Sequence, residues 1–161
     1  MKHKFVLPAL IMVCALLAAC GGATEKSVTI DVEAACAALK VSEIDGEKYF
    51  SEFKTPADDF LTDSLGIDIE QLENRAALVS PNDMSPCMVL LLVPKQEARD
   101  EVKSELAAGL EDYQKRWDNY LPEQAALVHE RMETEIGDCL ITIISPDNDT
   151  ALDAVRSAEN R

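Results

Sequence analysis

The sequence is poor in positive charge. Its 161 residues contain 15 Lys and Arg against 30 Asp and Glu, which gives a formal net charge of -15. A protein that binds nucleic acid or an anionic membrane surface needs a cationic face, because it must replace counterions or meet phosphate groups. The charge therefore argues against nucleic acid as a partner and against electrostatic attachment to lipid.

Motifs for catalysis and metal binding are also missing. Neither of the two histidines stands in an H-E-x-x-H motif, and the chain has no G-x-S-x-G motif and no C-x-x-C pair. Asp147, Asp149 and Asp153 lack the spacing of a calcium loop, so we interpret them as helix-capping residues. We interpret His129 as a surface or edge-strand residue. The sequence predicts no catalytic residue, no metal site and no cofactor.

The first twenty residues form a pattern of their own. A positively charged start precedes the apolar run Val6–Leu17. About a dozen residues at 1.5 Å each are too few to cross a hydrocarbon core of roughly 30 Å, and the run is typical of a signal peptide. Leu17, Ala18, Ala19 and Cys20 then match the bacterial lipobox, in which a peptidase cuts before the cysteine and the thiol carries a lipid. An ordinary signal peptide with an incidental cysteine is the alternative.

This pattern predicts where the protein resides. Residues 1–19 are expected to be a lipoprotein signal peptide, with Leu17, Ala18 and Ala19 read by the peptidase, and Cys20 is expected to carry a diacylglycerol-type lipid. Two acyl chains give stable anchoring where one would be marginal. Residues 20–30 are then a flexible tether, and residues 31–161 are a single domain on the extracytoplasmic face of the cell membrane. Loss of two lysines with residues 1–19 makes that domain more acidic still.

Three further cysteines, Cys36, Cys87 and Cys139, lie in apolar stretches at wide spacing. An odd number cannot form a complete disulfide framework within one chain. We expect buried free thiols, and a Cys87–Cys139 bridge is the alternative if their strands are adjacent.

Hydrophobic periodicity predicts an α+β fold. We expect helices over 31–40 (capped by Asp31), 95–120 and 123–128, a helical turn or two within 67–72, and a last helix that opens with a capping box at Thr150 and runs to Ala158. Strands 76–80 and 87–93 form one hairpin, and 132–136 and 140–144 form another around Gly137-Asp138. Residues 41–62 are expected to be irregular, with aromatic side chains docked on the domain. The expected architecture is a small antiparallel sheet of two hairpins, packed on one face against the long amphipathic helix and the shorter terminal helices.

One helical stripe is a candidate binding surface. Tyr113, Trp117 and Tyr120 stand at i, i+4 and i+7 of the long helix. If exposed, they would form a sugar-stacking or partner-binding surface. Because the stripe continues the apolar face of the same helix, core packing is the simpler interpretation.

The order of motifs resembles the DUF4358 family of small Firmicutes lipoproteins. The resemblance is carried by Cys20-Gly21-Gly22, Leu65-Gly66-Ile67, Glu111-Asp112-Tyr113-Gln114, the corner from Trp117 to Glu123, the Gly137 hairpin and Ser145-Pro146-Asp147. It spans about Leu65 to Ala158. Many relatives have an aromatic residue just after the hairpin glycine, where this chain has Asp138-Cys139. The resemblance implies a Gram-positive, membrane-anchored protein and supplies no activity.

These observations favour a non-enzymatic module that binds an envelope protein or a wall component. A small envelope hydrolase with a carboxylate pair is the first alternative, although it would need a cleft. A solute-capturing lipoprotein of a transporter is the second, although such proteins are usually much longer than this chain.

Overall fold

The computed structural model describes residues 28–55 and 58–160. Its centre is a four-stranded antiparallel sheet in the order β2-β3-β5-β4. The strands are β2 (Leu72–Val79), β3 (Met88–Pro94), β4 (Met132–Ile136) and β5 (Cys139–Ile144). Both predicted hairpins are confirmed, and the pairing of Met88 with Ile144 joins them through β3 and β5.

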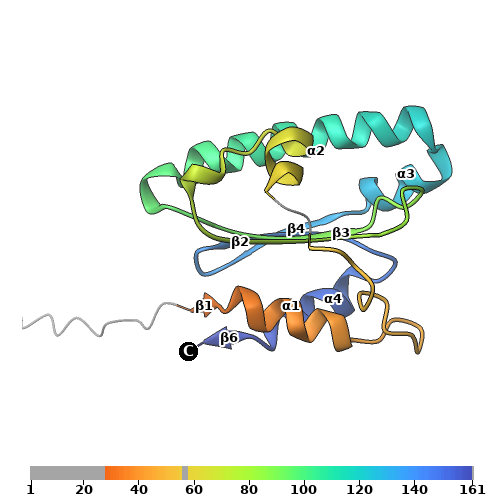
Figure 1. Cartoon of the computed structure of the whole chain (residues 1–161), viewed down its shortest axis with the longest axis horizontal. Helices are drawn as coiled ribbons and strands as arrows, with labels where there is room; N and C mark the ends of the chain where they lie inside the picture. Colours follow the sequence, from red (N-terminus) through yellow and green to blue (C-terminus); the bar gives the residue numbers. More distant parts are fainter. Residues whose placement is uncertain (1–27, 56–57, 161) are drawn as a thin grey trace, which may run out of the picture.

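Helices cover both faces of the sheet, so the prediction of helices on one face was wrong (Figure 1). One face carries α2 (Arg99–Tyr120), α3 (Pro122–His129) and two single-turn elements, η1 (Phe60–Ser64) and η2 (Ile69–Gln71). The other face carries α1 (Val32–Val41) and α4 (Asn148–Arg156). The reason lies in β3, where Leu90 and Leu91 are both fully buried but belong to cores on opposite faces of the sheet. An uninterrupted apolar strand needs cover on both sides.

The two ends of the described chain meet in a small second sheet. β1 (Thr29–Ile30) pairs antiparallel with β6 (Glu159–Asn160), and Ile30 is buried. The fold therefore includes residues 29 and 30, which the sequence places in the tether. Val28 lies against the β4–β5 turn. The approach is so close that a Cβ atom added at Gly137 would stand only 1.8 Å from the Val28 carbonyl oxygen.

The helix ends follow the capping rules, with one correction. The Asp31 carboxylate accepts the Ala34 N–H at 2.9 Å and begins α1 as predicted. The last helix begins at Asn148, since Asp147 caps it by accepting the Thr150 N–H at 3.0 Å. The predicted start at Thr150 was wrong, because the Thr150 hydroxyl itself donates to Asp147 at 2.7 Å. The long helix begins with η3 (Gln96–Ala98), a single 3₁₀ turn that leads into α2.

The irregular segment before β2 supplies aromatic side chains to the core, as predicted. Tyr49, Phe50 and Phe53 pack against one another on the α1 side of the sheet, with ring centroids 5.0–5.5 Å apart; two of the three ring pairs are edge to face and one is tilted. Phe60 packs on the opposite side. Phe53 and Phe60 thus belong to different helical layers.

Cys36, Cys87 and Cys139 are free thiols, two of them buried and Cys36 half-buried. The Cys87–Cys139 bridge does not form, although β3 and β5 are adjacent. Cys87 precedes Met88, which pairs with Ile144, whereas Cys139 begins β5. The two thiols thus lie at opposite ends of the paired strands, more than about 15 Å apart at roughly 3.3 Å per residue.

Within the described residues, no helix combines the length and apolar character that a membrane span requires.

Candidate functional site

The candidate site is a groove of about 350 Å³ at the C-terminal end of α2. It is lined by side chains from α2, η1 and the turn between β2 and β3, which are Phe60, Ser64, Asp83, Tyr113, Arg116, Trp117 and Tyr120. We call it the aromatic groove. It contains all three members of the predicted stripe.

The stripe divides between core and surface. Tyr113 and Trp117 are 8% and 9% exposed and pack in the core below α2, whereas Tyr120 is 66% exposed. Tyr120 closes the helix, and its hydroxyl contacts the sulfur of Met84 at 3.8 Å. The prediction of core packing is thus confirmed for the first two rings and wrong for the third, because α2 ends where Tyr120 faces the β2–β3 turn.

The aromatic rings are held in a fixed arrangement. Tyr113 donates its hydroxyl to the Pro86 carbonyl at 3.0 Å, and burial raises the pKa of that phenol to about 12, which keeps the donor proton in place. The Trp117 ring lies 6.1 Å from Tyr113 and 6.3 Å from Tyr120. Tilted and edge-to-face pairs at such distances stabilise aromatic clusters.

Of the described residues that line the groove, Arg116 is the one basic residue, and it contacts two other groups of the fold. The Arg116 guanidinium lies 5.5 Å from the centroid of the Tyr113 ring and donates to the Ser64 carbonyl at 2.9 Å. It therefore ties α2 to η1, while the side chain stays exposed to solvent.

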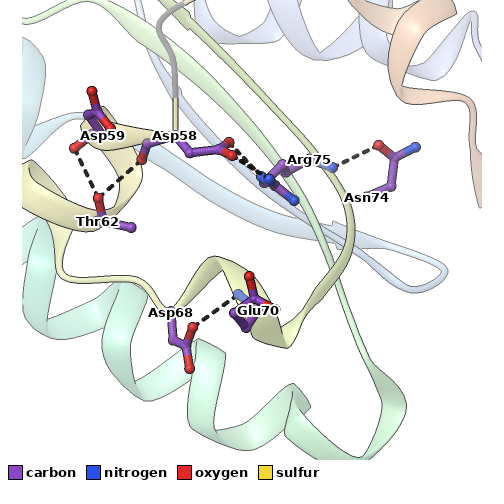
Figure 2. Close-up of polar contacts among 7 residues, drawn as sticks. All are labelled: Asp58, Asp59, Thr62, Asp68, Glu70, Asn74 and Arg75. Carbon is purple, nitrogen blue, oxygen red and sulfur yellow. Dashed lines mark hydrogen bonds and ion pairs between the residues drawn. The ribbon is translucent and has the colours of Figure 1, made fainter.

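Figure 2 shows how the chain holds η1, which contributes Phe60 and Ser64. The carboxylate of Asp58 accepts two hydrogen bonds from Arg75 of β2, one of them from Nε at 2.7 Å, and Arg75 lowers the pKa of that carboxyl. Directly after η1, the backbone of Leu65 lies close to Gly109 of α2. A Cβ atom added at Gly109 would be 2.1 Å from the Leu65 oxygen. The ion pair and this contact fix η1 between the sheet and α2.

Exposed acidic side chains lie in or next to the segments that line the aromatic groove. Asp83 lines the groove from the β2–β3 turn, and Asp59 and Asp63 directly precede Phe60 and Ser64, the two groove residues of η1. All three are exposed, and within residues 28–55 and 58–160 none of them forms a salt bridge. The groove thus has a largely aromatic lining with one carboxylate and one guanidinium, and two further exposed carboxylates stand next to its η1 residues in the sequence.

A second cleft tests the carboxylate-pair alternative. About 250 Å³ in volume, it lies between α2 and β4, with Glu133 and Glu135 on its wall. Both carboxylates are held by cations. Glu135 accepts from Lys103 and Arg99, each at 2.7 Å, which lower its pKa, and Glu133 accepts from Arg131 at 2.7 Å. A glycosidase acid needs a carboxyl whose pKa is raised so that it stays protonated. The pKa of Glu135 is shifted in the opposite direction, and Glu133 is held in an ion pair with Arg131.

The remaining predicted residues lie apart from both sites or outside the described chain. His129 ends α3 at the surface, with its Nε2 atom 2.8 Å from Asp118. Among the residues that the structure covers, no group of three or more His, Cys, Asp or Glu side chains is placed to hold a metal ion. The lipidation site Cys20 and the peptidase-recognition residues Leu17, Ala18 and Ala19 lie outside the described residues.

Sequence reasoning missed Met84, Phe60 and Asp83, because they come from segments far from α2 in the chain. The only available signal was the cluster of turn-forming residues between the first two strands, which predicted a turn but not which helix it would meet.

Comparison with known proteins identifies the family. The sequence model of the domain of unknown function DUF4358 matches residues 48–145. The match both begins and ends earlier in the chain than the resemblance that the motifs predicted. It includes η1, α2 and the β2–β3 turn. No curated protein and no solved structure matched the chain. Since the match covers more than half of the sequence, the chain belongs to the DUF4358 family.

Proposed function

We propose that this protein is an extracytoplasmic lipoprotein, held on the cell membrane by a diacylglycerol-type lipid on Cys20, whose domain binds another protein of the cell envelope through the aromatic groove. The observation that carries the binding role is the exposed ring of Tyr120 beside Met84, which is 50% exposed. Exposed aromatic and methionine side chains at a concave surface are typical of protein interfaces.

The position of the aromatic groove supports this role. The described chain begins at Val28, beside the Gly137 turn, and Arg99 at the start of α2 donates to the Gly137 and Asp138 carbonyls. Trp117 stands 18 residues further along α2, about 27 Å at 1.5 Å per residue. Figure 1 places β1 and β6 at one end of the molecule and the α2–α3 corner at the other. A lipid attached before residue 28 would thus hold the groove away from the membrane.

The geometry gives less support to the hydrolase alternative, because the carboxylates of the α2–β4 cleft are paired with cations. A transporter-linked solute receptor would need a deeper enclosed site than either cleft offers.

Site-specific crosslinking in living cells tests the proposal. A photoreactive phenylalanine analogue replaces Tyr120 in the full-length chain, and in a control it replaces Glu97, an exposed residue of η3 near the opposite end of α2. We expect discrete protein adducts from position 120 and none from position 97. Equal labelling from the two positions, or no adduct from position 120, would contradict a binding role for the groove.

A further inference from the structure

We infer that the occupant of the aromatic groove is an extended basic segment of the partner protein, which places an apolar side chain between Tyr120 and Phe60 and its Lys or Arg side chains against Asp59, Asp63 and Asp83. This inference rests on the proposed function and adds the chemical class of the ligand.

The apolar part of the argument comes from the side chains that the fold leaves open. Three large apolar side chains of the described residues are exposed, namely Val41, Met84 and Tyr120, and two of them meet at this groove. Phe60, which is half-buried, lines the same groove from η1. A methionine is flexible and polarisable enough to accommodate different apolar partners. An inserted aliphatic or aromatic side chain would remove these surfaces from water.

The charged part comes from an imbalance of charge near the groove. Three carboxylates, those of Asp59, Asp63 and Asp83, form no salt bridge among the residues described. They stand against one guanidinium, that of Arg116, which contacts the Tyr113 ring and the Ser64 carbonyl, so negative charge is in excess here. A cationic segment would satisfy these carboxylates, and a net charge of -15 would speed its approach. A second copy of this chain is a poor occupant, because two such domains repel each other.

Ring exposure favours a peptide over a sugar. A stacked sugar needs an open ring face, but Trp117 is only 9% exposed and Tyr113 is 8% exposed and covered by Arg116. Of the three rings of the stripe, only that of Tyr120 is largely exposed. A side chain that enters edge-on between Tyr120 and Phe60 uses the groove better than a flat ring does.

Trp117 allows a direct test, because it is the only tryptophan of the chain and lines the groove. The probe is a synthetic peptide of alternating Lys with Leu or Phe, titrated against the protein while Trp117 emission is recorded. A matched peptide carries Glu in place of every Lys. We expect saturable binding of the basic peptide only, weakened about tenfold or more by Tyr120→Ala, as for a central aromatic contact.

Charge variants distinguish binding to the carboxylates near the groove from general attraction to an acidic protein. The double variant Asp63→Asn with Asp83→Asn is compared with Glu33→Gln with Glu73→Gln, which removes the same charge from exposed positions of α1 and β2. We expect several-fold weaker binding for the first pair and near-native binding for the second, with circular dichroism showing that both fold. Equal losses would overturn the inference. Binding of a chitin oligosaccharide that depends on Tyr120, without peptide binding, would also overturn it, while crosslinking from position 120 would still support the proposed function.

Discussion

Replacing Gly109 by alanine is expected to destabilise the domain, against the usual effect of that substitution in a helix. Gly109 lies inside α2, where alanine is favoured over glycine by about 1 kcal/mol. At this position, however, a Cβ would stand 2.1 Å from the Leu65 oxygen and 2.9 Å from its carbonyl carbon. Backbone atoms cannot turn aside as a flexible side chain can, so α2 and Leu65 must move apart by about 1 Å.

The expected magnitude follows from these two opposing effects. Leu65 is 2% exposed and packs in the same core as Leu110, so the displacement disturbs a close-packed region. Overpacking of this kind costs about 1–3 kcal/mol, and a clash with backbone belongs at the upper end. Subtracting the helix-propensity gain of about 1 kcal/mol leaves a net loss of about 2 kcal/mol in the free energy of unfolding.

Urea unfolding followed by Trp117 fluorescence measures this loss. The control is Ala107→Gly, at an exposed position of the same helix, which should lose about 1 kcal/mol through propensity alone. The two substitutions run in opposite directions, yet both should destabilise. If Gly109→Ala instead raised the free energy of unfolding by about 1 kcal/mol, the close approach of Leu65 to α2 would be refuted. Because Leu65 follows Ser64 of the aromatic groove, the variant should also weaken binding at Tyr120.

Three further predictions concern the anchor, the thiols and the pH dependence of stability. Cys20→Ser should release the protein into the medium or leave the precursor uncut, as seen by cell fractionation and mass, and unchanged membrane retention would contradict lipidation. In a chain that starts at residue 21, only Cys36 should react readily with a thiol reagent before unfolding. The reason is that Cys87 and Cys139 are buried, and burial raises the pKa of Cys139 to about 12; rapid native labelling of Cys139 would be inconsistent with the fold. Glu135→Gln should cost up to about 1 kcal/mol in urea unfolding above pH 4.5, the ordinary pKa of a glutamate. Because Lys103 and Arg99 lower the pKa of Glu135 in the folded state, this contribution should vanish as the pH falls through that lowered value, and a difference that grows on acidification would contradict the ion pairs.

The local elements of this protein could be predicted from neighbouring residues alone. The 3.6-residue period of α2, the turn residues after β2 and the Gly137 turn identified one long helix and two hairpins, because these signals depend on neighbours in the chain. The lipobox at Cys20 is equally local and supports the predicted membrane anchor without any reference to the fold.

What each element faces depends on how distant segments pack together in the fold. The run from Met88 to Val93 was compatible with cover on one face or both, and only the docking of α1 and α4 shows that both faces are covered. The same holds for Tyr120, whose position on the apolar face of α2 predicted burial. It is exposed because α2 ends there beside the β2–β3 turn. Periodicity shows which residues share a face of a helix. How much of that face the sheet covers depends on contacts between distant segments of the chain. The same contacts bring η1, the β2–β3 turn and the end of α2 together at the aromatic groove.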